Sequence, residues 1–302
     1  MNILFASETE KPEAWIPLLE RALPAERFTL VADASIDVAL IANPAPGTLE
    51  KLSRPKLIQS LWMGVEKLLA DPALPKGVPL ARLVDPGMVA AMSETVLAHV
   101  LDWHRLHYRY RSQQRSRTWR RYGQKMASDR TVGLLGLGEL GADAARKLLA
   151  LGFNVAGWSR RPKSLADVQS FTELEPMLRI TDALVCLLPL TPRTRGILNR
   201  ENLSLLKPKG CVINVARGGH VVNQDLLAAL DSGHLAHAYL DVFEQEPLAA
   251  ADALWSHPGV SITPHSAALT EPRTAVPRLV ENIERTRRGE APLNQVDFAA
   301  GY

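Results

Sequence analysis

Three side chains in the second half of the sequence are of the types that can assist the reduction of a carbonyl group by a hydride donor. Arg217, Glu246 and His265 each follow a short apolar run. An arginine can bind a carboxylate through two parallel hydrogen bonds and polarise the adjacent carbonyl group. A histidine can deliver a proton to the carbonyl oxygen near neutral pH while a hydride reaches the carbon. Together the three residue types fit the reduction of a 2-oxo acid.

The carboxylate of this set is expected to assist the histidine. A carboxylate that is hydrogen-bonded to His265 favours the charged imidazolium and holds the ring in one orientation. Glu246 is the favoured partner, but Glu244 lies only two residues away. The spacing alone leaves both carboxylates open.

A glycine-rich segment precedes these residues and is typical of a dinucleotide site. Residues 131–141 read TVGLLGLGELG, an apolar strand that leads through G-x-G-x-x-G into a helical pattern. Gly136 would permit the tight turn, Gly138 the approach of a pyrophosphate, and Gly141 the packing of the helix against the strand. A turn without a ligand is the alternative, but the flanking strand and helix favour a cofactor. The expected cofactor contacts here are Gly136, Leu137, Gly138, Glu139 and Leu140.

The end of the next predicted strand indicates which nucleotide would bind. An NAD site usually has an acidic residue about 20 residues beyond the glycines, where it accepts hydrogen bonds from the ribose 2′-hydroxyl. This chain has Ser159, Arg160 and Arg161 there. A guanidinium group can bind a 2′-phosphate that a carboxylate would repel. We therefore expect NADP(H), with a merely solvated arginine pair as the alternative.

Short apolar runs alternate with helical patterns along most of the chain. Several runs are apolar at consecutive positions, as expected where helices cover both faces of a parallel sheet. Helices are expected at 140–151 and at 224–231, the second between Asn223 as N-cap and Gly233 beyond its end. This alternation predicts an α/β fold of the doubly wound type. The predicted strands are 3–6, 37–41, 57–61, 80–84, 131–135, 153–158, 183–188, 211–215, 238–242 and 260–263.

The pattern forms two blocks, and 302 residues are enough for two domains of about 150 residues each. One block covers residues 1–85 and the other residues 131–263. A long helix without glycine or proline is expected between them, at 89–111, and a further helix at 271–288. The sequence does not say which block this last helix joins.

The composition excludes several classes of protein. With 46% hydrophobic and 22% charged residues, disorder and a disulfide scaffold are not expected. The net charge of +3 is too small to indicate nucleic acid as a partner. Cys186 and Cys211 lie in apolar runs, and no run approaches the roughly 20 residues that span a bilayer. We expect a cytoplasmic protein that binds neither membrane nor metal.

The segments around Arg217, Glu246 and His265, in this order and spacing, resemble the D-isomer-specific 2-hydroxyacid dehydrogenase family. The resemblance covers nearly the whole chain. The segments LWMGVE at 61–66, GMVAAMSE at 87–94 and VDFAAGY at 296–302 are similar to those of an NADPH-using subgroup. The resemblance implies that Arg217, Glu246 and His265 are catalytic, since it assigns the carboxylate to the glutamate before Pro247.

The resemblance also implies roles for other residues. The segment around Met63 would hold the substrate carboxylate through backbone groups, and Asp241 would hydrogen-bond the nicotinamide carboxamide. Many relatives have aspartate in place of Glu66, which leaves the contact of this side chain open. The implied substrate contacts are Trp62, Met63, Gly64, Val65, Arg217 and His265. The implied cofactor contacts beyond the glycine turn are Ser159, Arg160, Arg161, Leu188, Pro189, Val215, Ala216 and Asp241.

The family has two Rossmann-like domains linked by long helices, and its substrate domain is discontinuous. The resemblance implies a substrate domain of residues 1–97 with 267–302, an NADP-binding domain of residues 98–266, and a homodimer. The expected activity is NADPH-dependent reduction of glyoxylate to glycolate and of hydroxypyruvate to D-glycerate. The alternatives are reduction of bulkier 2-oxo acids such as phenylpyruvate, and a non-enzymatic protein that senses the dinucleotide.

Residues 99–122 combine histidines and arginines with interleaved aromatic residues. A nucleic-acid surface is one interpretation. We favour a charged helix and loop beside a dimer interface, because the net charge is small and no nucleic-acid motif accompanies the segment. Trp119 is a candidate to reach the active site of a partner subunit.

Overall fold

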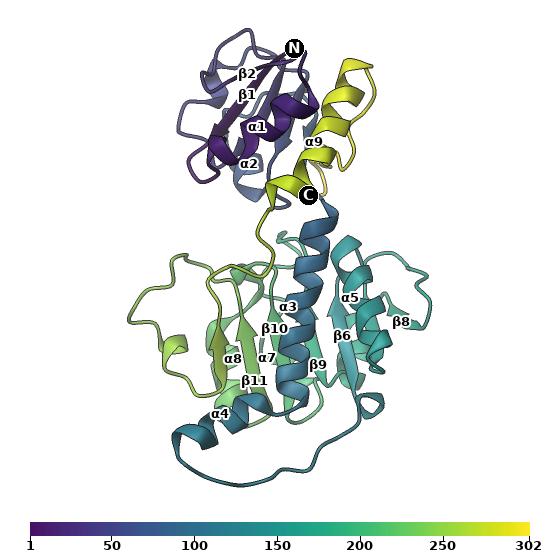
Figure 1. Cartoon of the computed structure of the whole chain (residues 1–302). Coiled ribbons are helices and arrows are strands. Elements are labelled where there is room, and N and C mark those ends of the chain that lie inside the picture. Colours follow the sequence, from purple (N-terminus) through teal and green to yellow (C-terminus); the bar gives the residue numbers. More distant parts are fainter. The chain divides into compact units, whose positions relative to one another are not determined.

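The structure is a computed structural model that describes residues 1–302, and the chain divides into two compact units. Unit one comprises Met1–Met88 and Leu269–Tyr302, and unit two comprises Val89–Ala268 (Figure 1). The two are described separately. The limits of the substrate domain and the NADP-binding domain, expected near residues 97 and 266, stay a prediction.

Unit one is built on a five-stranded parallel sheet in the order β2-β1-β3-β4-β5. Its strands are β1 (Asn2–Ser7), β2 (Arg27–Thr29), β3 (Val38–Ala42), β4 (Leu57–Ser60) and β5 (Leu80–Ala81). Its helices are α1 (Pro12–Ala22), α2 (Glu66–Ala70) and α9 (Pro272–Arg287). Leu279 and Ile283 of α9 are fully buried with Trp15 and Leu19 of α1 in one core. The helix near the end of the chain therefore belongs to the first block.

A buried amide pair also ties the last segment of the chain to this sheet. The Asn282 side-chain amide donates to Gln59 Oε1 over 2.7 Å, and Asn282 Oδ1 accepts from the Leu293 N–H over 2.7 Å. Both side chains are almost completely buried. Because buried polar groups are costly without partners, this pairing fixes how α9 and the residues after it lie on β4.

Unit two contains a seven-stranded parallel sheet in the order β12-β11-β10-β9-β6-β7-β8. Its strands are β6 (Thr131–Leu135), β7 (Asn154–Trp158), β8 (Val168–Phe171), β9 (Ala183–Cys186), β10 (Gly210–Asn214), β11 (Leu235–Leu240) and β12 (Val260–Ile262). Strand order reverses at β6, which lies between β7 and β9. Ligands of such sheets bind at the carboxyl ends of the strands beside this reversal. The predicted α/β fold class is confirmed.

Helices cover both faces of this sheet. Side chains of α3 and α5 share one core cluster with β6, β9 and β10, and side chains of α6, α7 and α8 share another with the opposite face. The bounds are α3 (Pro86–His104), α4 (His107–Arg115), α5 (Glu139–Ala150), α6 (Leu174–Ile180), α7 (Arg200–Ser204) and α8 (Asn223–Asp231). Double coverage explains why these strands are apolar at consecutive positions.

Two details of the predicted helices were wrong. The single helix expected at 89–111 is interrupted, because Leu106 adopts a left-handed φ of 61° between α3 and α4. Asn223 is the first residue of α8 and not its N-cap, since Val222 occupies that position. Gly233, with φ of 69°, does lie just beyond the end of α8 as predicted.

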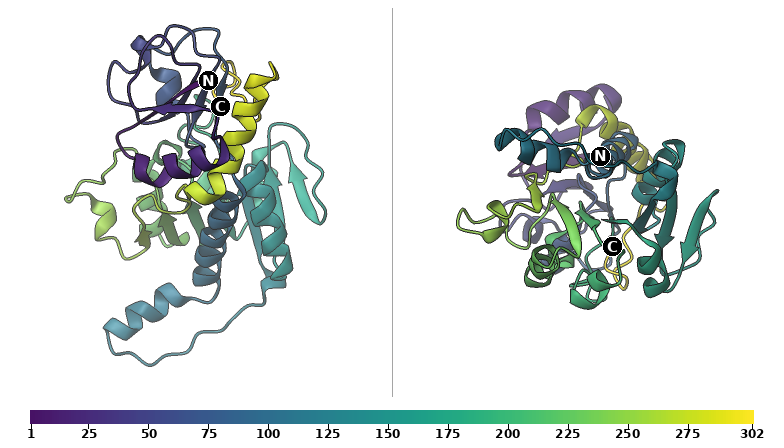
Figure 2. Two further views of the ribbon diagram at one scale, coloured as in Figure 1. Left: turned by 45° about the horizontal axis from the view of Figure 1, so that its top comes forward. Right: turned by 90° about the horizontal axis from the view of Figure 1, so that it is seen from below.

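The helix α4 buries none of its residues, and Figure 2 shows it and the segment after it standing out from the sheet of unit two. The Trp119 side chain in that segment is 93% exposed. The attachment of α4 rests on few contacts. Arg111 forms a two-pronged ion pair with Asp102, and the Tyr108 ring packs on His237.

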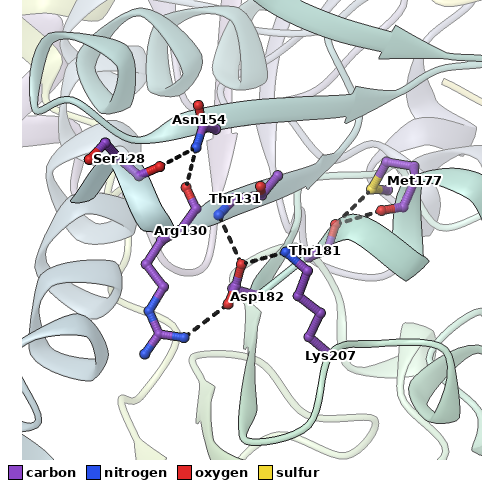
Figure 3. Close-up of polar contacts among 8 residues, drawn as sticks. All are labelled: Ser128, Arg130, Thr131, Asn154, Met177, Thr181, Asp182 and Lys207. Atoms are coloured by element: carbon purple, nitrogen blue, oxygen red, sulfur yellow. Dashed lines mark hydrogen bonds and ion pairs between the residues drawn. The ribbon is translucent and has the colours of Figure 1, made fainter. Parts of the chain in front are cut away.

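A charged cluster fixes the amino-terminal ends of β6 and β9. The Asp182 carboxylate accepts from the Thr131 N–H over 3.0 Å, from Arg130 over 2.9 Å and from Lys207 over 3.0 Å (Figure 3). Burial alone would raise the pKa of Asp182, but these hydrogen bonds outweigh it and hold the pKa below its ordinary value. The charged form is therefore the one that anchors the two central strands.

His237 on β11 is buried between two tyrosine rings. Its ring centroid lies 4.5 Å from that of Tyr108 and 4.7 Å from that of Tyr239, and Nε2 contacts Ser261 Oγ at 2.8 Å. Nδ1 is buried and has no hydrogen-bond partner. Burial lowers the pKa of His237 to about 4, although the Asp102 carboxylate acts in the opposite direction. The native fold therefore holds this imidazole in its neutral form.

Acid is expected to destabilise unit two through His237. In the unfolded chain a histidine takes up its proton near pH 6.5, whereas the folded protein excludes it until about pH 4. The free energy of unfolding should therefore fall as the pH drops through this window, by about 3 kcal/mol in total. Urea unfolding of the wild type and of His237→Phe at pH 7, 5 and 4 measures how much His237 contributes to the fall in the free energy of unfolding. An equal decline in both proteins would contradict it.

Candidate active site

The glycine-rich turn joins β6 to α5. Gly136 has a φ of 104°, which favours glycine, and a Cβ on Gly141 would lie 1.9 Å from the Gly136 carbonyl oxygen. Nothing lies within 4 Å of the Cβ position of Gly138, the N-cap of α5. The open N-terminus of a 12-residue helix thus meets a turn whose backbone a phosphate could approach closely. These residues fit a pyrophosphate group.

The expected contacts of this turn differ in what they can offer. The Leu137 side chain is buried and packs beside Gly157, so only the backbone of Leu137 can face a ligand. Gly138 and Glu139 are exposed and Leu140 is half-buried. On the other side of the turn, the Leu187 carbonyl oxygen lies 3.1 Å from the Cβ position of Gly136, and Leu188 is 9% exposed. The segment that begins at Leu187 therefore borders the turn.

The loop after β7 carries the arginine pair. Ser159 Oγ donates to the Arg161 carbonyl oxygen over 2.7 Å, and the Ser159 N–H donates to the Phe171 carbonyl oxygen over 3.1 Å. Arg160 and Arg161 are exposed. The donor set at this strand end is thus a hydroxyl and two guanidinium groups, which suits a phosphate ester better than a hydroxyl group.

The three segments predicted to carry the catalytic side chains leave neighbouring strands at the same edge of the sheet. The Asp241 N–H after β11 donates to the Asn214 carbonyl oxygen of β10 over 3.0 Å. The Thr263 N–H after β12 donates to the Leu240 carbonyl oxygen of β11 over 3.0 Å. Because parallel strands end together, the segments that follow β10, β11 and β12 lie side by side, where such folds place catalytic groups.

His265 and Glu246 form a direct pair. His265 Nδ1 lies 2.7 Å from Glu246 Oε2, and Glu246 Oε1 accepts from the Phe243 N–H over 2.9 Å. The imidazole is 50% exposed and the carboxylate 35%. With Nδ1 engaged by the carboxylate, Nε2 is the ring nitrogen that can pass a proton to another molecule. Glu244 points elsewhere, to Arg195 at 2.9 Å.

Arg217 follows β10 and is half-buried. Its Nη1 donates to the Ala216 carbonyl oxygen over 2.7 Å. Its own carbonyl oxygen accepts from the Asn214 side-chain amide over 2.9 Å and contacts His220 Nδ1 at 3.0 Å. Asn214 and His220 are completely buried, and they fix the backbone that carries the guanidinium group. In the sequence, the polar Asn214 at the end of an apolar strand could have indicated that the backbone of Arg217 is fixed in this way.

The remaining predicted contacts of unit two are largely buried. Val215 is 4% exposed and Ala216 7%. The Pro189 carbonyl oxygen accepts from Thr194 Oγ1 over 2.7 Å. Asp241 is 1% exposed, and its carboxylate accepts hydrogen bonds from the turn that carries His265. The structure thus joins Asp241 to the histidine segment, a relation that the sequence did not reveal.

The predicted substrate segment after β4 lies in unit one. The Trp62 indole N–H donates to Glu10 over 2.8 Å, and the Trp62 backbone N–H donates to Ser60 Oγ over 3.0 Å. Val65 is buried, whereas Met63 and Gly64 are partly exposed. Two side chains outside the predicted segment therefore hold Trp62 in place.

Comparisons with known proteins identify relatives of this chain. Residues 97–267 match the family described as D-isomer specific 2-hydroxyacid dehydrogenase, NAD binding domain. The chain is 40% identical to glyoxylate/hydroxypyruvate reductase A of Serratia proteamaculans strain 568, with all of both chains covered.

Many solved structures match, and for the two described here the match covers all of this chain and 99% of the other. One is a D-isomer specific 2-hydroxyacid dehydrogenase from Xanthobacter autotrophicus Py2 in complex with NADPH and MES, with a TM-score of 0.96 and 40% identity. The other is an NADPH-dependent glyoxylate/hydroxypyruvate reductase from Sinorhizobium meliloti in complex with NADP and sulfate, with a TM-score of 0.93 and 37% identity.

Proposed function

The chain belongs to the D-isomer-specific 2-hydroxyacid dehydrogenase family, and on that premise we propose that it is an NADPH-dependent reductase of small 2-oxo acids. Its proposed reactions are glyoxylate to glycolate and hydroxypyruvate to D-glycerate, the substrates in the names of its full-length relatives. The observation that carries the proposal is the His265–Glu246 pair. Its two residues stand on the segments after β12 and β11, and Arg217 follows β10, the strand next to β11.

Each of these side chains has a distinct task. Bound NADPH supplies the hydride that reaches the carbonyl carbon. Arg217 binds the substrate carboxylate and polarises the carbonyl group. His265 donates the proton from Nε2 to the carbonyl oxygen, and Glu246 holds the imidazole in one orientation through Nδ1. The backbone amides of Met63, Gly64 and Val65 are the proposed substrate contacts of unit one.

The residues around β6 and β7 support NADP(H) as the cofactor. The glycine turn and the N-terminus of α5 would hold the pyrophosphate, and Ser159, Arg160 and Arg161 would hold the 2′-phosphate. Close structural relatives contain NADPH or NADP. We assign the further contacts Leu188, Pro189, Val215 and Ala216 to the same cofactor.

Oxidation of NADPH at 340 nm tests the function directly. We expect turnover with glyoxylate and hydroxypyruvate, and slower turnover with phenylpyruvate. A preference for phenylpyruvate would keep the chemistry and overturn the choice of small substrates. Tight NADPH binding without turnover of any 2-oxo acid would favour a dinucleotide-sensing protein instead.

The arginine pair is expected to determine cofactor preference. The double variant Arg160→Ala/Arg161→Ala should raise the KM for NADPH by about 10–100-fold, because charge-assisted hydrogen bonds to the 2′-phosphate are lost. The KM for NADH should stay within about twofold, since NADH has a 2′-hydroxyl in place of the 2′-phosphate and loses no charge-assisted hydrogen bond. Steady-state kinetics with both cofactors measure this, with Arg179→Ala as the control on α6. Equal losses for NADPH and NADH would contradict the assignment.

We also propose that the enzyme works as a cytoplasmic homodimer. The free, buried thiols of Cys186 and Cys211 support a reducing compartment. No helix of the structure has the length and apolar character needed to cross a membrane. The exposed Trp119 and the unburied α4 support a dimer interface. Light scattering of the wild type and of Trp119→Ala tests the assembly, and assays with phenylpyruvate test whether Trp119 limits substrate size.

A further inference from the structure

The turn at residues 263–267 holds His265 in an unusual backbone conformation. Its φ is 52°, in the left-handed region that only a few per cent of residues other than glycine adopt, with histidine, asparagine and aspartate the most frequent among them. Such a conformation persists where the surroundings fix it from several sides, and it is concentrated at functional sites. What fixes this turn therefore also fixes the direction of the imidazole.

Asp241 accepts most of the hydrogen bonds that the turn donates. Its Oδ1 accepts from Thr263 Oγ1 over 2.6 Å and from the Ser266 N–H over 2.9 Å, and its Oδ2 accepts from the Ala267 N–H over 3.0 Å. Its backbone carbonyl oxygen accepts from the His265 N–H over 2.8 Å. One residue thus binds the turn before, at and after the histidine.

The opposite side of the turn is held by the helix α3. Thr95 Oγ1 donates to the Ala267 carbonyl oxygen over 2.8 Å. Because Asp241 is 1% exposed, water cannot replace the donors of the turn without opening this part of the fold. The His265 side chain, by contrast, is half exposed, so its position depends on its backbone and on Glu246.

We propose that Asp241 is a positioning residue of the reductase, which holds the turn so that His265 Nδ1 meets Glu246. The inference rests on the proposed function, because it assumes that His265 is the proton donor. It adds a role to Asp241 that differs from a contact with the nicotinamide carboxamide. A carboxylate has about four lone-pair positions, and the turn already uses three of them.

Thr263 separates the two roles of Asp241. Thr263→Val keeps the shape of the side chain and removes its donor, whereas Thr263→Ser keeps the donor. If Asp241 acts through the turn, Thr263→Val should lower kcat by about 10–100-fold, the order of loss that misplacement of a reacting group produces. Thr263→Ser should keep kcat within about threefold, and the Kd for NADPH should be unchanged in both. A Thr263→Val enzyme with the kcat of the wild type would overturn the proposal.

Asp241→Asn is the second test. It should lower kcat at least as much as Thr263→Val while the Kd for NADPH, measured by fluorescence titration, changes little. The control Asp231→Asn makes the same chemical change at the end of α8 and should leave kcat unchanged. A large rise in the Kd for NADPH with the kcat of the wild type at saturating NADPH would instead assign Asp241 to the cofactor.

The experiments distinguish failure of the proposed reductase function from failure of the positioning role of Asp241. Absence of turnover in the wild type would remove the proposed function itself. Normal turnover in the wild type, with kcat retained in Thr263→Val and Asp241→Asn, would remove only the role of Asp241. Should Asp241→Asn fail to fold, as judged from its Tm, the Thr263 pair alone decides between the two outcomes.

Discussion

His265→Ala is expected to lower kcat for glyoxylate by about 10²–10⁴, the range that removal of a general acid produces. The physical reason is that water must then protonate the carbonyl oxygen as hydride arrives. The Kd for NADPH should stay close to that of the wild type, because no proposed cofactor contact is removed. Steady-state kinetics and a fluorescence titration of NADPH together measure both quantities.

Two further variants make this result specific. His257→Ala removes an imidazole that pairs with Asp231 at the surface of unit two, and it should leave kcat unchanged. Glu246→Gln keeps a hydrogen-bond acceptor beside Nδ1 but replaces a charge-assisted hydrogen bond by a weaker neutral one. It should therefore give an intermediate loss of kcat. If His265→Ala kept the turnover of the wild type, the general acid would have to be another group.

The sequence predicted the buried strands well because sheets covered on both faces give continuous apolar runs. The runs at 131–135, 183–188 and 211–215 all correspond to central strands of unit two. The strands Arg27–Thr29 and Val168–Phe171 were missed. Both lie at sheet edges and have no buried residue, so they lack the apolar run on which the prediction depends.

Features set by tertiary contacts could not be predicted. Nothing in the residues around Leu106 marks a break, since neither glycine nor proline is present, yet the chain turns there to bring Tyr108 onto His237. His237 was interpreted as a surface or loop residue, which was wrong, because it is buried on β11 against the Tyr108 and Tyr239 rings. This burial sets its protonation.

The candidate site likewise combines features that the sequence predicts with features that only tertiary contacts determine. The types and order of Arg217, Glu246 and His265 follow from the sequence, because each stands after an apolar run that becomes a strand of one parallel sheet. The selection of Glu246 over Glu244 by spacing alone was undecided. In the structure Glu246 accepts from the Phe243 N–H and meets His265, whereas Glu244 pairs with Arg195. Folding of the loop, which no local pattern encodes, makes this choice.

Arg217→Met is expected to lower kcat by about 10²–10³, the loss produced when one preorganised donor to a developing oxyanion is removed. The KM for glyoxylate should also rise, because the substrate carboxylate loses a charge-assisted partner. Arg217→Lys should recover only part of both losses, since an ammonium group keeps the charge without the planar fork of donors. Steady-state kinetics of the wild type, Arg217→Met and Arg217→Lys with glyoxylate measure the loss of kcat and the rise of KM separately.

The Arg217 result depends on where the guanidinium group is held. Gly218 lies so close to the Phe243 carbonyl that a Cβ there would be 1.9 Å from its carbon, and Asn214 and His220 contact the Arg217 carbonyl oxygen. This backbone is fixed, so the loss should come from the missing guanidinium and not from a displaced loop. Arg179→Met, which breaks an exposed ion pair with Glu175 on α6, is the matched control and should leave kcat unchanged. A rise in KM with the kcat of the wild type would mean that Arg217 binds the substrate carboxylate only and takes no part in polarising the carbonyl group.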